Sequence, residues 1–304
     1  MASLSIIIPT KDRGEIFLKT LQSIISASSS SDTEIIVVNN SLTPIQLANK
    51  PNNVSVYDNP YDKNSVFSSR NYGASLARNQ VLLFIDDDII VSKESIVYAL
   101  RFHDENSNAC FNVNWQYPPE LLAEMEKNIF GKFLMKTGFT TMRSLYGEGW
   151  KDNAPFIARS LASFFFCIKK DDFMKIGGYN EKHLHEGTDI DITDKLIENK
   201  ITIWINPLIM VYHNEADRID LMNWLQRKKR FGVISRNAVN MGDSSHALHY
   251  TGIKVLAFRM IYIFQPLLLQ LLAILNKLKA NELGFKVIDA LLGANICVGY
   301  NSTK

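Results

Sequence analysis

Cysteine is scarce in this chain of 304 residues, which holds only Cys110, Cys167 and Cys297. The number is odd, the spacing is wide and no Cys-x-x-Cys motif occurs, so the sequence indicates no disulfide framework. Cys110 and Cys167 lie inside apolar runs. We interpret them as reduced core residues of a cytosolic protein.

A strong overall charge is also missing. The net charge is +2, which argues neither for nor against a nucleic-acid partner. No internal repeat stands out, and the first apolar run, Leu4–Ile8, is too short for a signal peptide and predicts a strand instead. What the chain does have is a hydrophobic content of 46%, which supports a substantial core in one large α/β domain or two.

The rest of the sequence is organised around the apolar run 81–85, which leads directly into Asp86, Asp87 and Asp88. A short run of this kind predicts a strand that is buried on both faces. An unpaired carboxylate is costly in such a core, so the three acids must lie where the strand leaves the sheet. Ligands of open α/β sheets bind at that edge, and hard oxygen ligands suit Mg²⁺ or Mn²⁺. A solvated acidic turn is the alternative that the triplet alone leaves open.

Helical and extended patterns alternate around this run, which predicts a parallel, three-layer α/β unit. Strands are expected over 4–8, 35–38, 54–57, 109–115, 160–169, 201–205 and 209–212. Helices are expected over 15–27, 65–78, 93–104, 120–134, 170–175 and 188–199. Residues 136–153 have no clear period and several glycines and aromatics, which favours a substrate loop over a plain connector.

The last third of the chain changes character. The basic stretch 227–230 is either a solvated helix face or a contact with anionic lipid. The apolar run 255–275 is long enough to span a bilayer, but Arg259, Pro266 and two glutamines favour a helix that lies in the interface or packs on the protein. Another helix is expected over 283–298. We therefore divide the chain into residues 1–215 and a C-terminal helical region, 216–304, with a membrane-surface role as the favoured interpretation.

Several short motifs follow one another in a specific order. They are Ile8–Arg13, Val37–Ser41, Arg70–Ala74, Asp86–Asp88, Gly177–Glu181, Thr188–Asp191 and His213. Together, over residues 3–215, they resemble the family 2 glycosyltransferases. The resemblance implies a GT-A fold, that is, a Rossmann-like, mostly parallel α/β sheet flanked by helices, here with a C-terminal helical extension.

The resemblance implies that a nucleoside-diphosphate sugar lies across the ends of the first strands. Pro9, Thr10 and Asp12 would line the nucleoside pocket. Asn39 stands where Asp is common in the family. Its amide oxygen can accept the uracil N3–H, but an amide also donates. The sequence therefore favours UDP as the nucleotide without establishing it. Arg70 would neutralise the diphosphate or fix the base end of the pocket.

Asp86 and Asp88 match the two ends of the family's D-x-D motif, and His213 matches a position that completes the metal shell. The implied cofactor is Mn²⁺ or Mg²⁺, acting as a Lewis acid. Alternate residues of a strand point the same way. We therefore expect Asp86 and Asp88 to face the cation, whereas Asp87, which we count among the donor-binding residues, points to the other side.

A second acidic cluster follows at 183–194. Thr188 would cap a helix whose first turn holds Asp189 and Asp191. An inverting transfer needs a carboxylate that takes the acceptor proton. Because Thr188 replaces the first acid of the family's pair, Asp189 is the expected base, with Asp191 and Glu186 as alternatives. Acids in a first helical turn also favour the helix dipole, which is a purely structural explanation.

The resemblance thus implies an inverting, metal-dependent glycosyltransferase of cell-surface polysaccharide synthesis, at the inner face of the cell membrane. It would move one sugar to a hydroxyl of a glycan or lipid-linked acceptor, since no multi-span region like that of processive synthases is visible. A sugar-nucleotide nucleotidyltransferase is an alternative, although its glycine-rich first loop is missing. A non-catalytic glycan- or lipid-binding scaffold is another, against which the acids at 86, 88, 189 and 191 argue.

Overall fold

Three fully buried strands lie side by side in one half of the sheet: β1 (Leu4–Thr10), β2 (Thr33–Asn39) and β4 (Val81–Ile85). Their branched apolar side chains suit strands that are covered on both faces. β1 pairs in parallel with both β2 and β4, and β3 (Val54–Asp58) adds a fourth parallel strand beside β2. The carboxyl ends of these four strands therefore meet at one edge of the sheet.

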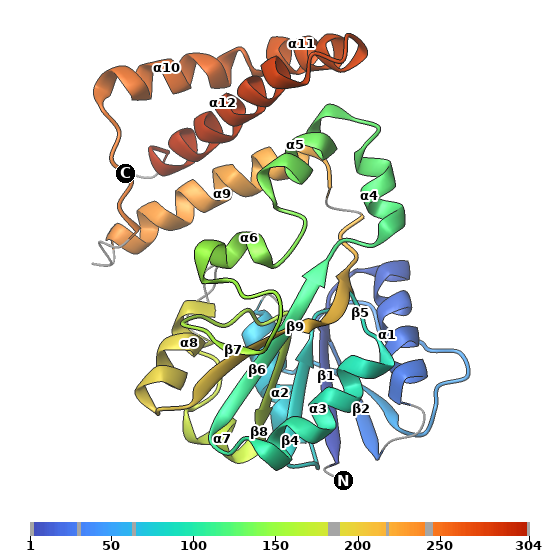
Figure 1. Cartoon of the computed structure of the whole chain (residues 1–304). Coiled ribbons are helices and arrows are strands. Elements are labelled where there is room, and N and C mark those ends of the chain that lie inside the picture. The colour runs from blue at the N-terminus through green and yellow to red at the C-terminus, as the bar shows by residue number, and fades with distance from the viewer. Residues whose placement is uncertain are drawn as a thin grey trace. The chain divides into compact units, whose positions relative to one another are not determined.

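The structure, a computed structural model, describes residues 3–28, 32–62, 65–181, 189–216, 219–240 and 246–302 (Figure 1). The strand order is β3-β2-β1-β4-β8-β6-β9-β5, and β7 pairs with β9. The later strands are β5 (Ile89–Ile90), β6 (Ala109–Gln116), β7 (Phe156–Ile157), β8 (Phe165–Lys169) and β9 (Thr202–His213). β8 runs antiparallel to its neighbours β4 and β6, whereas β6 and β9 are parallel. The predicted α/β sheet with flanking helices is confirmed, and its second half is mixed.

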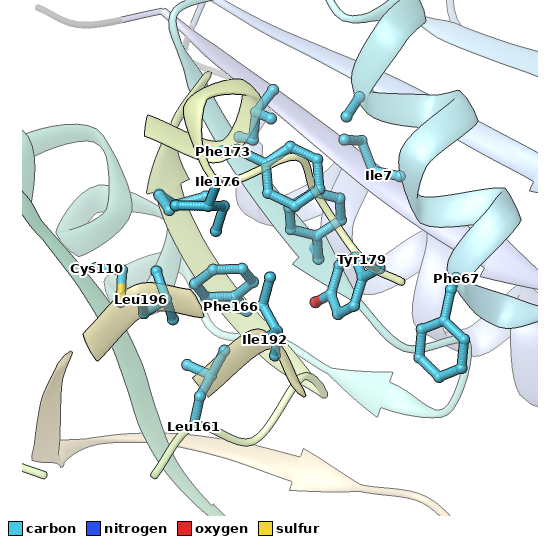
Figure 2. Packing of buried hydrophobic residues seen from close by; sticks show 14 of the residues in the cluster. Ile7, Phe67, Cys110, Leu161, Phe166, Phe173, Ile176, Tyr179, Ile192 and Leu196 are labelled. Atoms are coloured by element: carbon cyan, nitrogen blue, oxygen red, sulfur yellow. The ribbon is translucent and has the colours of Figure 1, made fainter. Parts of the chain in front are cut away.

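Helices cover both faces of this sheet. Around one face lie α2 (Val66–Leu76), α7 (Lys170–Lys175) and α8 (Asp189–Glu198), whose apolar side chains form one cluster with the strands (Figure 2). Within it, the ring of Phe84 lies 4.9 Å from that of Phe173 and 5.6 Å from that of Phe166. The other face is covered by α1 (Gly14–Ser28) and α3 (Lys93–Glu105), with Phe102 of α3 packed on Phe111 of β6. The acidic triplet therefore follows a strand that is packed on both faces, which fixes the position of the triplet.

The chain falls into two compact units. The first combines Met1–Gln116 with Thr141–Asn214 and holds the sheet, together with α6 (Arg143–Tyr146) and the 3₁₀ turn Gly147–Gly149. The second combines Tyr117–Thr140 with Glu215–Lys304. The sequence division after residue 215 assigned Tyr117–Thr140 to the first part. In the structure these residues, which form α4 (Pro119–Met125) and α5 (Ile129–Thr137), group with the C-terminal helices.

The second unit is built on α12 (Asn281–Tyr300), which packs against α9 (Leu221–Asn240) on one side and α10 (Gly252–Ile263) and α11 (Gln265–Lys277) on another (Figure 1). Glycines let α9 and α12 approach closely, because a Cβ on Gly232 would overlap the carbonyl of Ile296 and one on Gly299 would overlap that of Lys229. By length and composition, α12 is the one described helix that could cross a membrane, but 56% of its apolar window is buried. The pair α10 and α11 meets the same test only together, and it is bent by 70°.

Element boundaries differ from the sequence predictions where local chemistry intervenes. The expected helix 120–134 is two helices, since the Asn128 side chain accepts from the Gly131 N–H and starts α5 anew. The two short strands expected after residue 200 form one strand, β9, opposite a register shift between Val113 and Asn114. The apolar run 255–275 is broken at Phe264, and Pro266, which lacks an N–H, lies in the first turn of α11. Cys110, Cys167 and Cys297 are buried free thiols.

Replacing Gly73 by alanine is expected to destabilise the first unit. Gly73 of α2 faces β1 and β2, where an added Cβ would overlap Ile7 and lie 3.3 Å from Val38 Cγ2. Overpacking of this kind costs about 1–3 kcal/mol, which lowers the melting temperature by several degrees. The matched control is Gly149→Ala, where an added Cβ meets nothing within 4 Å. Equal melting temperatures of the two variants would contradict the packing described for α2.

Candidate active site

Polar side chains follow each of the four parallel strands. Thr10 ends β1, Asn39 ends β2, Asp58 ends β3, and the acidic triplet 86–88 follows β4. Ligands of open α/β sheets bind at this edge because the strand ends and the loops after them expose polar groups there. The structure therefore gathers most of the residues that the sequence singles out as donor-binding or metal-binding.

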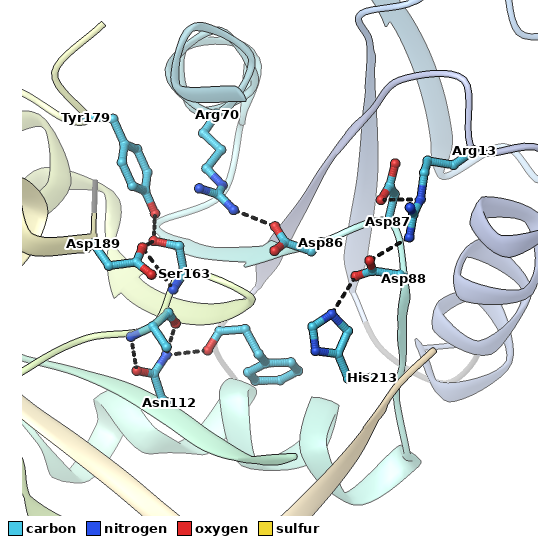
Figure 3. Close-up of polar contacts among 12 residues, drawn as sticks. Arg13, Arg70, Asp86, Asp87, Asp88, Asn112, Ser163, Tyr179, Asp189 and His213 are labelled. Atoms are coloured by element: carbon cyan, nitrogen blue, oxygen red, sulfur yellow. Dashed lines mark hydrogen bonds and ion pairs between the residues drawn. The ribbon is translucent and has the colours of Figure 1, made fainter. Parts of the chain in front are cut away.

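The three acids point toward different partners (Figure 3). The chain turns directly after Ile85, and the Ile89 N–H donates to the Asp86 carbonyl at 3.2 Å. Asp86 pairs with Arg70, whereas Asp87 accepts from Thr10 Oγ1 at 2.7 Å. Asp86 and Asp87 thus point to different partners, as strand alternation predicts, whereas Asp88 shares Arg13 with Asp87. That Asp86 and Asp88 face one cation stays a prediction.

Arg13 is one of the residues of this site to which the sequence assigned no role. Its guanidinium lies 2.6 Å from Asp88 Oδ2 and 3.4 Å from Asp87 Oδ1, and its side chain is only 6% exposed. The loop after β1 turns it inward. Asp12 adopts a left-handed φ of 53°, and its N–H donates to Ser41 Oγ at 2.8 Å. Charge balance could have identified Arg13 from the sequence, because buried carboxylates require nearby cations.

Negative charge is in excess around the triplet. Two guanidiniums, those of Arg13 and Arg70, face the carboxylates of Asp86, Asp87 and Asp88. Burial and then the neighbouring Asp88 carboxylate raise the pKa of Asp87 to about 7, against the hydrogen bond from Thr10 and the charge of Arg13. The contribution of Asp88 to this pKa shift shows that the carboxylates repel one another, and an additional cation would relieve that repulsion.

His213 lies beside Asp88 at the end of β9. Ile89 of β5 pairs with His213, and the Asn214 N–H donates to the Asp88 carbonyl at 2.7 Å, which holds the two chain segments together. The imidazole Nε2 is 3.2 Å from Asp88 Oδ1, and the Trp115 ring packs edge-on at 5.0 Å. The two side chains offer an oxygen and a nitrogen within 4.8 Å of each other, a donor set that could hold a metal.

Arg70 connects the triplet to the other half of the site. It is buried on α2, pairs with Asp86 and stacks over the ring of Tyr179 at 5.2 Å. Burial alone would lower the pKa of Arg70, but the carboxylate of Asp86, with smaller contributions from Tyr179 and Asp189, raises it, so the side chain is a permanent cation. The next residue, Asn71, fixes the Tyr179 backbone, donating to its carbonyl and accepting from its N–H, both at 2.9 Å.

The glycine pair before Tyr179 has a steric role. Gly178 adopts a left-handed φ of 59°, and a Cβ there would lie 2.5 Å from Asn71 Oδ1. Any other residue would push Asn71 away from Tyr179. The motifs 70–74 and 177–181, recognised separately in the sequence, are thus two sides of one contact.

Asp189 faces the Arg70 side of the site from the first turn of α8 (Figure 3). Its Oδ1 accepts from both the backbone N–H, at 3.2 Å, and the hydroxyl of Ser163, and the Ser163 hydroxyl also accepts from Tyr179 at 3.1 Å. The buried Asn112 holds the loop around Ser163, donating to the carbonyls of Ala162 and Phe165, each at 2.7 Å. Phe164 of this loop accepts from the Asp86 N–H at 3.0 Å.

Other predicted residues have different surroundings. The Asp191 carboxylate lies 3.2 Å from Lys195 one turn along α8. Pro9 is buried within β1 opposite Val38. Asn39 is fully buried and donates to Asp58 Oδ1 at 2.7 Å and to the Thr43 carbonyl at 3.0 Å. Thr188 and Glu186 lie outside the described residues.

The oxygen of the Asn39 amide is hydrogen-bonded within the protein as well. Its Oδ1 accepts from the Ser41 N–H at 2.9 Å. The polar group that faces outward at this part of the edge is therefore the exposed carboxylate of Asp58.

Comparison with solved structures shows the same fold. A crystal structure of GalNAc-T7 with UDP, GalNAc and Mn²⁺ is 15% identical over 70% of this chain, with a TM-score of 0.54, and this chain spans 43% of its length. The mannosyltransferase PcManGT from Pyrobaculum calidifontis, in complex with GDP-Man and Mn²⁺, is 12% identical. It covers 99% of this chain, which spans 88% of its length, with a TM-score of 0.53. No curated protein matches the chain.

The family is shown by a separate match. Residues 5–166, more than half of the chain, match the model of Glycosyl transferase family 2. This range includes β1, the acidic triplet and Arg70, and it sets aside a nucleotidyltransferase and a non-catalytic scaffold as alternatives. The chain therefore belongs to glycosyl transferase family 2 and is a glycosyltransferase of GT-A fold.

Proposed function

We propose that this enzyme is an inverting, metal-dependent glycosyltransferase that uses a nucleoside-diphosphate sugar. The observation that carries the proposal is the division of the site into two acidic halves. Asp88 and His213 form one half, Asp189 forms the other, and the Arg70–Asp86 ion pair lies between them (Figure 3). An inverting displacement at a sugar carbon needs this arrangement, because the hydroxyl attacks from the side opposite to the one on which the leaving group departs.

The residues at the first half fit a divalent cation. The carboxylate suits Mn²⁺ and Mg²⁺ alike, and the imidazole nitrogen favours a transition-metal ion such as Mn²⁺. The excess of carboxylates over guanidiniums and the raised pKa of Asp87 favour the added charge. When bound, the cation would neutralise charge on the donor diphosphate as its bond to the sugar breaks. The two solved structures described above carry Mn²⁺ with their nucleotides.

Asp58 is the residue that we assign to the nucleobase. Successive strands are about 4.8 Å apart, so the three steps from β4 to β3 span about 14 Å, which is the scale of a nucleoside diphosphate. A diphosphate at the triplet would thus bring the base to the end of β3. An exposed carboxylate there accepts the N3–H of uracil or the N1–H of guanine, but it repels the N3 lone pair of cytosine. In this assignment Asn39 orients Asp58 through their 2.7 Å hydrogen bond.

Asp189 is the residue that we assign as the base. The Ser163 bonds fall on Oδ1, so Oδ2 is the oxygen for the acceptor proton. The acceptor oxygen attacks the anomeric carbon and gives its proton to Asp189, while the electron pair of the sugar–phosphate bond leaves with the nucleoside diphosphate. Attack from the face opposite the leaving group inverts the anomeric configuration.

The acceptor proposed here is a hydroxyl of a glycan or lipid-linked glycan of the cell surface, and the location is the inner face of the cell membrane. Two features support this proposal. Residues 221–304 hold eleven lysines and arginines against three acids, although the whole chain is nearly neutral. The same residues form α9–α12, in which apolar and basic segments alternate.

Changing the proposed metal ligands should weaken Mn²⁺ binding. Asp88→Asn and His213→Ala are each expected to raise the Mn²⁺ concentration for half-maximal donor hydrolysis or transfer by 10-fold or more, since even second-layer changes at metal sites cost about 10- to 100-fold. Glu94→Gln, an exposed acid on α3, is the control. Mn²⁺ dependence that is unchanged in both ligand variants would refute the assignment.

Asp189→Asn should slow transfer while leaving donor binding intact. Loss of a general base costs about 10²- to 10⁴-fold in kcat. The matched control is Asp191→Asn, two residues along the helix, whose carboxylate already pairs with Lys195. Steady-state kinetics with nucleotide binding by calorimetry separate the two effects. Near-normal kcat in Asp189→Asn, or a larger loss in Asp191→Asn, would move the base to another residue.

Asp58→Asn should weaken nucleotide binding rather than catalysis. A hydrogen bond to a charged group contributes about 1.5–3 kcal/mol, so affinity for UDP or GDP should fall tenfold or more with kcat retained. Asn39→Ala should cause a smaller loss, because it frees Asp58 without removing it. Thermal shifts with UDP, GDP and CDP, each with and without Mn²⁺, provide the measurement. An Asp58→Asn variant that keeps its nucleotide preference would disprove this role.

A further inference from the structure

The outer side of α10 and α11 is apolar. Among the described residues, twenty-two large hydrophobic side chains are exposed, and nine of them lie between Ile253 and Leu278. They recur at helical spacing along both helices: Ile253, Leu256, Met260, Ile263, Phe264, Leu267, Leu271, Ile274 and Leu278. Ile253 is 85% exposed and Leu278 is 71% exposed. A helix of a water-soluble protein turns this kind of stripe toward its core.

The inner side of the same helices carries polar groups. Gln265 accepts from the buried Asn295 of α12 at 2.8 Å, and the Tyr262 hydroxyl accepts from Lys229 of α9 at 2.8 Å. α10 has no fully buried residue, and it contacts α12 through Phe258, whose ring lies over Gly293. Apart from Leu272 and Leu275 of α11, which are buried, these helices thus present most of their large apolar side chains outward.

We propose that this stripe is a membrane-binding surface that lies flat in the headgroup region of an anionic bilayer. The charge of the residues beside the stripe indicates an anionic membrane as its partner. From His246 to Asn281 the sequence has no aspartate or glutamate, whereas Lys254, Arg259, Lys277 and Lys279 are all exposed. Basic residues beside an apolar stripe match a layer of anionic headgroups above acyl chains. The inference rests on the membrane location proposed above and not on the reaction.

Geometry favours a flat orientation over a crossing one. α10 and α11 meet at a bend of 70°, and neither helix alone has the length of a span. Phe264, the one aromatic residue of the stripe, suits an apolar helix face at the boundary between headgroups and acyl chains. α12, the one described helix of spanning length, is held in its unit by close contacts with α9 at Gly232 and Gly299.

Vesicle flotation of the full chain tests the proposal. We expect the protein to float with vesicles of phosphatidylcholine and phosphatidylglycerol, and less with phosphatidylcholine alone or at high salt. Leu256→Asp combined with Leu267→Asp should reduce the floated fraction at least tenfold. The control pair is Ile197→Asp with Leu208→Asp, equally exposed apolar residues of the first unit, which should float like the wild type.

Three outcomes would overturn the proposal. They are no flotation of the wild type, undiminished flotation of the Leu256/Leu267 variant, and equal loss in both pairs. A wild-type dimer that ignores vesicles and becomes monomeric in the Leu256/Leu267 variant would assign the stripe to a second copy of the chain instead. Circular dichroism and melting temperature verify that each variant is folded. Transfer to a soluble acceptor, measured without vesicles, reports on the reaction independently, so failure of one proposal is distinguishable from failure of the other.

Discussion

The balance of charge at the end of β4 is the constraint on which the catalytic unit depends. Three carboxylates follow a strand that is buried on both faces, and they are themselves largely buried, so they require positive partners. Arg13, from the loop after β1, and Arg70, from α2, both reach them. Each arginine thereby ties another element to the triplet, so the charge requirement also fixes the positions of the loop and the helix.

A series of hydrogen bonds leads from the neighbour of Arg70 to the other half of the site. Asn71 holds the Tyr179 backbone, and the Tyr179 hydroxyl donates to Ser163, which in turn holds Asp189. Asn112 secures the Ser163 loop from the neighbouring strand β6. Polar groups in such a network are costly to leave unpaired, which restricts the whole chain of contacts to one arrangement. The carboxylate assigned as the base is therefore held in place by side chains from several other elements.

The sequence predicts much of this molecule because its strongest patterns are local. Apolar strands that end in polar loops identified the sheet, and the strand before Asp86 appears with the same bounds, 81–85. Arg13 was not assigned, because its importance comes from residues more than seventy positions away. The bond from Asn39 to Asp58 joins two neighbouring strand ends, and a pairing of that kind has no sequence signature. The insertion Tyr117–Thr140 was missed for the same reason, since its partners are C-terminal helices.

The single hydrogen bond from the Asp86 N–H to the Phe164 carbonyl has a mechanical consequence. It joins the acidic turn, on one side, to the loop that presents Ser163, on the other. We expect an adjustment of the turn to be passed on to this loop, and through Ser163 to the Asp189 carboxylate. Donor binding and the alignment of the acceptor side would then be linked, which would limit loss of the activated sugar to water.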